Sequence, residues 1–134
     1  MALDDQSRAI ASRIEGLDDG RAVVQALIEA TTEWITAQPE CAYFVFLARD
    51  PVAQGPYGDD LTERLHARYH PIDEILARDA EAGRILPLPA DLIPALVLGA
   101  TEFYARSWLA GRRQAAPTTH SQRLATAAWR ALTA

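Results

Sequence analysis

Several residue types are scarce in this chain of 134 residues, and each shortage excludes a class of protein. All 13 basic residues are arginines, and with 18 acidic residues the formal net charge is -5. An acidic chain without a basic run does not hold nucleic acid by itself, because that affinity rests on clustered cations. The single cysteine cannot form an internal disulfide. Since no apolar run spans a bilayer and no signal peptide is recognisable, we expect a cytoplasmic protein.

Motifs that carry catalysis are also missing. The chain contains no glycine-rich phosphate loop, no H-E-x-x-H and no C-x-x-C, so we predict neither an enzyme nor a cofactor. Cys41 is expected to be a buried, inert thiol. His66 and His70 are four residues apart and could share a metal ion on one helix face, but a solvated polar face is the favoured interpretation. We therefore predict no metal site.

The most informative stretch is Leu88–Arg112, in which the prolines and a closing glycine frame one long predicted helix. Pro94 suits a first helical turn and Gly111 suits a helix end. Apolar residues occupy most of the circumference between them, so the helix must be covered on several sides. The small residues Ala95 and Gly99 favour a second subunit on one of those sides, with the core of the domain on another.

Other patterns predict further helices and no strand. The expected fold is all-α, a bundle of about six helices in one domain. Residues 3–15 form the first helix and Gly16 ends it; Asp19 caps a second, which Pro39 ends. A short helix then follows. Asp60 and Glu63 cap a helix that Pro71 kinks and Gly83 ends, and Thr119 with Gln122 is a capping box for the last helix.

Four stretches together resemble one known family. Residues 80–111 contain a helix end, a short crossover and a long helix with a central Gly99, and residues 120–132 form a final helix of Ala, Leu and Trp. Upstream, residues 31–51 contain a helix that ends before Pro-Glu and a short apolar helix, while residues 3–16 look like the back half of a linking helix. In this order, the features resemble the C-terminal half of TetR-family transcriptional regulators over essentially the whole chain.

The resemblance implies a regulatory domain spanning 1–134, with a cavity for a small apolar or aromatic effector and a homodimer built from the last two helices as a four-helix interface. The candidate ligand-binding residues that it implies are Trp34, Phe44, Leu47, Leu65, His66, Tyr69, Ile72, Thr101 and Tyr104. The implied dimer-interface residues are Ala95, Gly99, Phe103, Arg106, Leu124, Ala127, Ala128 and Ala131. The alternative for each aromatic member is that it only fills the core.

Members of this family also carry an N-terminal helix-turn-helix unit, which this chain does not contain. The predicted function is therefore effector sensing and dimerisation, with DNA contacted only through a unit outside this chain and with no membrane partner. The alternative is a stand-alone helical dimer that acts as a small-molecule-binding or protein-interaction module without DNA binding.

Overall fold

The computed structural model describes residues 2–43 and 72–134, with side chains from Arg8 onward in the first helix. These residues form helices and no strand, which confirms the predicted all-α fold for the described part. No helix there has both the length and the apolar character needed to cross a membrane. The helices are α1 (Ala2–Ile14), α2 (Gly20–Ala37), α3 (Pro39–Tyr43), a helical segment at 72–81, α6 (Ile93–Leu109), the 3-10 helix η2 (Pro117–His120) and α7 (Ser121–Leu132).

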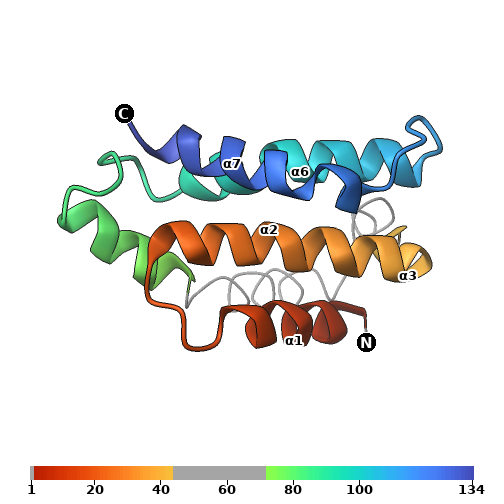
Figure 1. Ribbon diagram of the computed structural model, residues 1–134, viewed down its shortest axis with the longest axis horizontal. Helices are drawn as coiled ribbons and strands as arrows, with labels where there is room; N and C mark the ends of the chain where they lie inside the picture. Colours follow the sequence, from red (N-terminus) through yellow and green to blue (C-terminus); the bar gives the residue numbers. More distant parts are fainter. Residues whose placement is uncertain (1, 44–71) are drawn as a thin grey trace, which may run out of the picture.

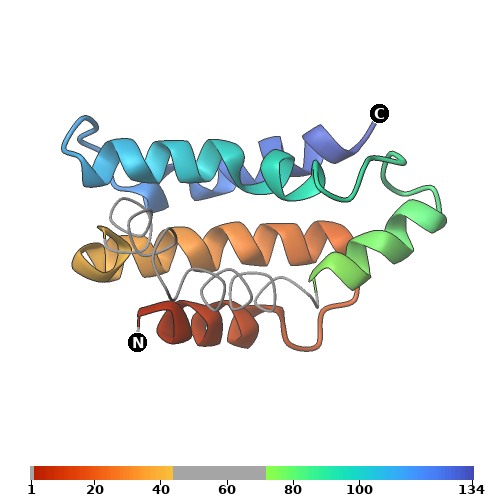
Figure 2. The same ribbon diagram turned by 180° about the vertical axis from the view of Figure 1, so that it is seen from behind.

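Helix α2 lies in the middle of the described fold. Helix α1 packs along one side of it, and α6 and α7 pack along the other (Figure 1). Helices α2 and α6 run in the same direction, whereas α7 returns antiparallel to both (Figure 2). The segment 72–81 lies at the end of the fold where α2 begins.

Most helix ends follow the local signals in the sequence. Asp19 caps α2, because its carboxylate accepts a hydrogen bond of 3.1 Å from the backbone N–H of Ala22. Pro39 follows the end of α2 and begins α3. Gly111 adopts a φ of 80° after α6, and the backbone N–H of Arg112 donates to the carbonyl of Ser107 at 2.8 Å, which is the hydrogen-bond pattern of a Schellman end.

One predicted capping motif is wrong. Thr119 lies inside η2, and His120 is the residue that precedes α7, with no side-chain capping hydrogen bond. The chain enters α7 directly from the 3-10 turn, so Thr119 does not hold the extended conformation that an N-cap requires. The predicted loop at 49–60, the cap at Asp60 and the kink at Pro71 lie outside the described residues.

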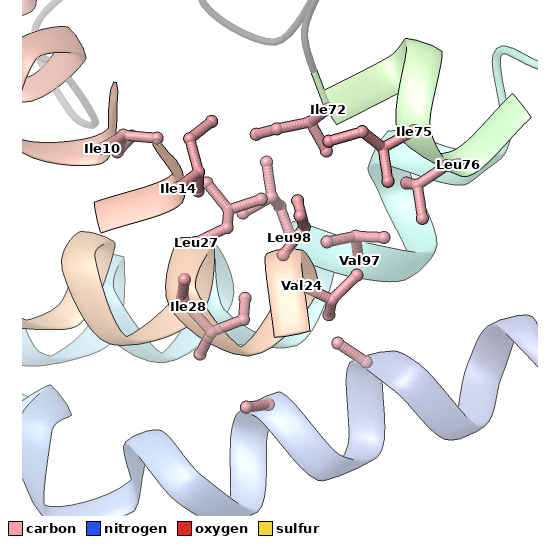
Figure 3. Close-up of a cluster of buried hydrophobic side chains, with 14 of the residues drawn as sticks. Ile10, Ile14, Val24, Leu27, Ile28, Ile72, Ile75, Leu76, Val97 and Leu98 are labelled. Atoms are coloured by element: carbon pink, nitrogen blue, oxygen red, sulfur yellow. The ribbon is translucent and has the colours of Figure 1, made fainter. Parts of the chain in front are cut away.

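A continuous apolar core joins the helices of the described part. Figure 3 shows side chains from α1, α2, α6 and the segment 72–81 converging in this core. Ile10 and Ile14 attach α1 to it, with exposed fractions of 0% and 9%. On the surface, Arg13 of α1 pairs with Glu29 at 2.7 Å and with Glu33 of α2. Apolar burial and this ion pair therefore hold α1 along α2.

A buried carboxylate joins the start of α2 to the segment 72–81. Asp79 is 1% exposed, and its Oδ2 accepts a hydrogen bond of 3.1 Å from the backbone N–H of Gly20. Its Oδ1 accepts from Arg84, at 2.9 Å from Nε and 2.8 Å from the terminal Nη2. Both oxygens are therefore satisfied, as a buried carboxylate requires.

Candidate functional site

Two buried hydroxyl groups in the described core have no hydrogen-bond partner. Thr31 of α2 is 2% exposed and Thr101 of α6 is 1% exposed, and the Oγ1 atom of each is unpaired. A buried threonine in a helix can satisfy its hydroxyl by bonding to the carbonyl one turn earlier. Thr32 does so, since its hydroxyl lies 2.9 Å from the carbonyl of Ile28, and Thr36 bonds to the carbonyl of Thr32 at 2.8 Å. The two unpaired hydroxyls depart from this local pattern.

The packing of α2 against α6 places these two threonines at the same level. Leu27 and Val97 line one small cavity, and Ile35 and Ala105 belong to one buried cluster. On α2, Thr31 lies one helical turn after Leu27 and one turn before Ile35. On α6, Thr101 lies one turn after Val97 and one turn before Ala105. Helices α2 and α6 run in the same direction (Figures 1 and 2). We therefore infer from the spacing in sequence that Thr31 and Thr101 lie at a similar level along the two helices.

Open space lies along the same seam on both sides of the threonines. On the α2 N-terminal side, an apolar cavity of about 20 Å³ is lined by residues that include Ile72, Val97 and Leu98. Beyond the other end of the seam, between α3 and α6, a mainly apolar groove of about 460 Å³ is lined by Pro39, Glu40, Tyr43, Trp108 and Leu109. The first holds no more than about one water molecule. The second has the size of a small-molecule site.

A buried hydroxyl without a hydrogen-bond partner lowers the free energy of unfolding, so the two unpaired threonines are candidates for contact with a ligand. Leaving such a group unsatisfied costs roughly 1–3 kcal/mol. Each hydroxyl can donate one hydrogen bond and accept two. The described core therefore contains two buried polar atoms in apolar surroundings. A site that orients a small apolar ligand likewise combines an apolar lining with a few polar groups.

The candidate ligand residues predicted from the resemblance occupy different parts of the structure. Thr101 lies in the seam, and Trp34 is 7% exposed in the buried cluster with Ala105. Ile72 lines the small cavity at the far end of the seam. Tyr104 contacts a different part of the fold, because its hydroxyl donates to the carbonyl of Ala115 at 2.8 Å and its ring meets His120 edge-on. The remaining candidates, which lie outside the described residues, are Phe44, Leu47, Leu65, His66 and Tyr69.

Thr31 is the site residue that the sequence analysis does not identify. It is the first of two adjacent threonines in an apolar helix, and only the second bonds to its own backbone. The available signal was the apolar spacing of α2, because Thr31 lies one turn from Leu27 and one turn from Ile35 on the buried face.

The predicted dimer-interface residues occupy both the surface and the core. Exposed positions on α6 include Phe103, which is 68% exposed, and Gly99, where an added Cβ would meet no atom within 4 Å. Ala128 is 4% exposed inside the core of the chain itself, and Leu124 is half-buried against that core. The remaining predicted positions, all exposed in the described structure, are Ala95, Arg106, Ala127 and Ala131.

The prediction that Cys41 is buried is wrong, because the side chain is half-buried and packs on the outside of the cluster that contains Trp34 and Ala105. His66 and His70 lie outside the described residues. Among the residues that the structure describes, no group of three His, Cys, Asp or Glu side chains could hold a metal ion.

No family model matches this chain, and no curated protein matches it.

Proposed function

We propose that this chain is a ligand-binding and dimerisation domain whose ligand is a small, mainly apolar molecule bound between α2 and α6. The observation that carries the proposal is the pair of buried, unpaired hydroxyls of Thr31 and Thr101 at one level of this seam. A ligand carbonyl or hydroxyl placed between them gives both threonines the partner that they lack. Such a bond discriminates strongly, because an analogue without the polar atom leaves the buried hydroxyls unpaired.

The groove at the end of the seam is the proposed route of entry. Trp108 lines the groove, and it is seven residues after Thr101 on α6, which corresponds to about 10 Å along the helix axis. Trp34 belongs to the buried cluster between these levels. We expect Trp34 to change rotamer when the ligand enters, because the interior at this level is otherwise filled.

In this proposal, α1 carries the response out of the site. Ile10 and Ile14 pack in the same core as Leu27, one turn before Thr31 on α2. A ligand that prefers one arrangement of α2 and α6 therefore favours one position of α1. The TetR-like part of the proposal is that α1 passes this change to a DNA-binding unit outside this chain, and it is supported by the resemblance of the sequence alone.

The proposed site can be tested with matched ligands. Medium-chain alcohols and ketones are compared with the corresponding hydrocarbons in a thermal-shift titration of the wild type, since a ligand that binds only the folded state raises the melting temperature. We expect the polar members to bind more tightly. In the double variant Thr31→Val/Thr101→Val, their Kd should rise by about tenfold or more, because two buried hydrogen bonds are lost.

Thr32→Val is the matched control, because Thr32 is equally buried but its hydroxyl already bonds to the backbone of α2. This variant should retain the preference for polar ligands. Equal binding of alcohols and hydrocarbons by the wild type, or an unchanged preference in the double variant, would show that the threonines do not contact ligand.

A further inference from the structure

A second groove, which the proposed function does not use, lies between α2 and α7. Its volume is about 330 Å³, within the range of small-molecule sites. Arg21 and Gln25 of α2 form one wall, and Trp129 and Arg130 of α7 belong to the other. The remaining lining residues are Gln122, Ala125 and Thr126. None of these described lining residues is acidic, although the chain as a whole has a formal charge of -5.

The two guanidinium groups of this groove are not neutralised by carboxylates in the described structure. Elsewhere, Arg13 pairs with two glutamates of α2 and Arg84 pairs with Asp79. Arg21 and Arg130 are exposed and form no ion pair with a described residue. The groove therefore keeps two positive charges available for a ligand.

The neighbouring surface of α7 extends this positive region. A wider groove of about 760 Å³ shares Arg130 with the first and adds His120 and Arg123 to its lining. Helix α7 contains no Asp or Glu at all. The carboxylate that Gln25 contacts, Glu29, is itself paired with Arg13 at 2.7 Å, so it does not cancel the charge of Arg21.

The uncharged side chains that line the groove indicate which chemical groups a bound anion would carry besides its negative charge. Trp129 is half-buried and packs against the core while it lines the groove, so its ring is held in place as a flat apolar wall. Gln122 and Thr126 provide neutral hydrogen-bonding groups beside the arginines. Guanidinium groups bind carboxylate and phosphate oxygens through paired hydrogen bonds.

We propose that the groove between α2 and α7 binds a small aromatic molecule that carries a carboxylate or phosphate. The oxyanion lies between Arg21 and Arg130, and the ring packs against Trp129. This site is separate from the seam between α2 and α6, so either site can be occupied without the other.

The test uses phenyl phosphate and benzoate as probes, with phenol supplying the ring alone and inorganic phosphate supplying the anion alone. Binding to the full chain is measured by isothermal titration calorimetry. We expect phenyl phosphate and benzoate to bind, and phenol and inorganic phosphate to bind at least about tenfold more weakly, because each makes only part of the contacts. Added salt should weaken the binding of both anionic aromatics.

Paired arginine variants locate the site. Arg21→Gln/Arg130→Gln should raise the Kd for phenyl phosphate by about tenfold or more, since hydrogen bonds to charged groups are the strong ones. The control Arg112→Gln/Arg113→Gln removes the same charge from exposed positions outside the groove and should leave the Kd within about twofold, because long-range attraction is screened by salt. Failure of the anionic aromatics to bind, or equal weakening by both pairs, would overturn the proposal.

Discussion

Replacing Gly20 with alanine is expected to lower the free energy of unfolding by about 2–4 kcal/mol, the cost of overpacking a buried contact that cannot relax. An added Cβ would overlap Oδ2 of Asp79. This carboxylate cannot simply turn away, because Arg84 holds its other oxygen and the carboxylate is 1% exposed. Urea denaturation followed by circular dichroism measures the change.

A double-mutant cycle assigns this cost to the Gly20–Asp79 contact. Asp79→Ala alone is expected to destabilise the fold, since it leaves the N–H of Gly20 and the guanidinium of Arg84 without their acceptor. In Gly20→Ala/Asp79→Ala the space for the new methyl group is restored. The double variant should therefore be more stable than the sum of the single changes predicts, by about 1 kcal/mol or more. Additive effects would mean that the contact does not determine the cost.

Phe103→Glu is expected to weaken self-association by about 30-fold or more, because a central aromatic in an interface contributes at least about 2 kcal/mol. The proposed dimer face of α6 contains Phe103, 68% exposed, one turn after Gly99. A charged carboxylate there would be desolvated against the apolar face of the second copy. Sedimentation equilibrium over a range of protein concentrations measures the dissociation constant.

The fold of the single chain should survive this substitution, because the ring of Phe103 makes little contact within the chain. Tyr43→Glu is the matched control, since Tyr43 is a 51% exposed aromatic on α3, a helix that contains none of the predicted dimer-interface residues. It should leave the dissociation constant unchanged. The dimer proposal is contradicted if the wild-type chain stays monomeric at high concentration. It is also contradicted if both variants raise the dissociation constant equally.

Helix ends in the described part are largely predictable from sequence, because the signals that set them are local. Asp19 caps α2 through a hydrogen bond three residues away, and Gly111 ends α6 through a backbone conformation that other residues adopt with difficulty. The capping box at Thr119 fails for an equally local reason. The 3-10 helix Pro117–His120 leads directly into α7, so Thr119 is already helical and cannot be the N-cap.

The candidate sites are less predictable, because they depend on the rotation of a helix and on the choice of hydrogen-bond partner. Ala127 and Ala128 are adjacent, yet the first is exposed and the second is buried in the core. Thr31 and Thr32 are adjacent and both buried, yet only the hydroxyl of Thr32 bonds to the backbone of α2. Asp79 resembles a surface charge in sequence, but the start of α2 buries it. Burial and hydrogen-bond partners at these positions are set by tertiary packing, which the periodicity of the sequence does not predict.

The most direct measurement for the α2–α6 site is the free energy of unfolding of Thr31→Val, Thr101→Val and Thr32→Val without ligand. We expect the first two to raise this free energy by about 1 kcal/mol or more, because valine has nearly the same shape as threonine and lacks the unpaired buried hydroxyl. Thr32→Val should lower it by about 1 kcal/mol, because a satisfied hydrogen bond is lost. If Thr31→Val and Thr101→Val lose as much stability as Thr32→Val, both hydroxyls already have partners and the proposed ligand site is contradicted.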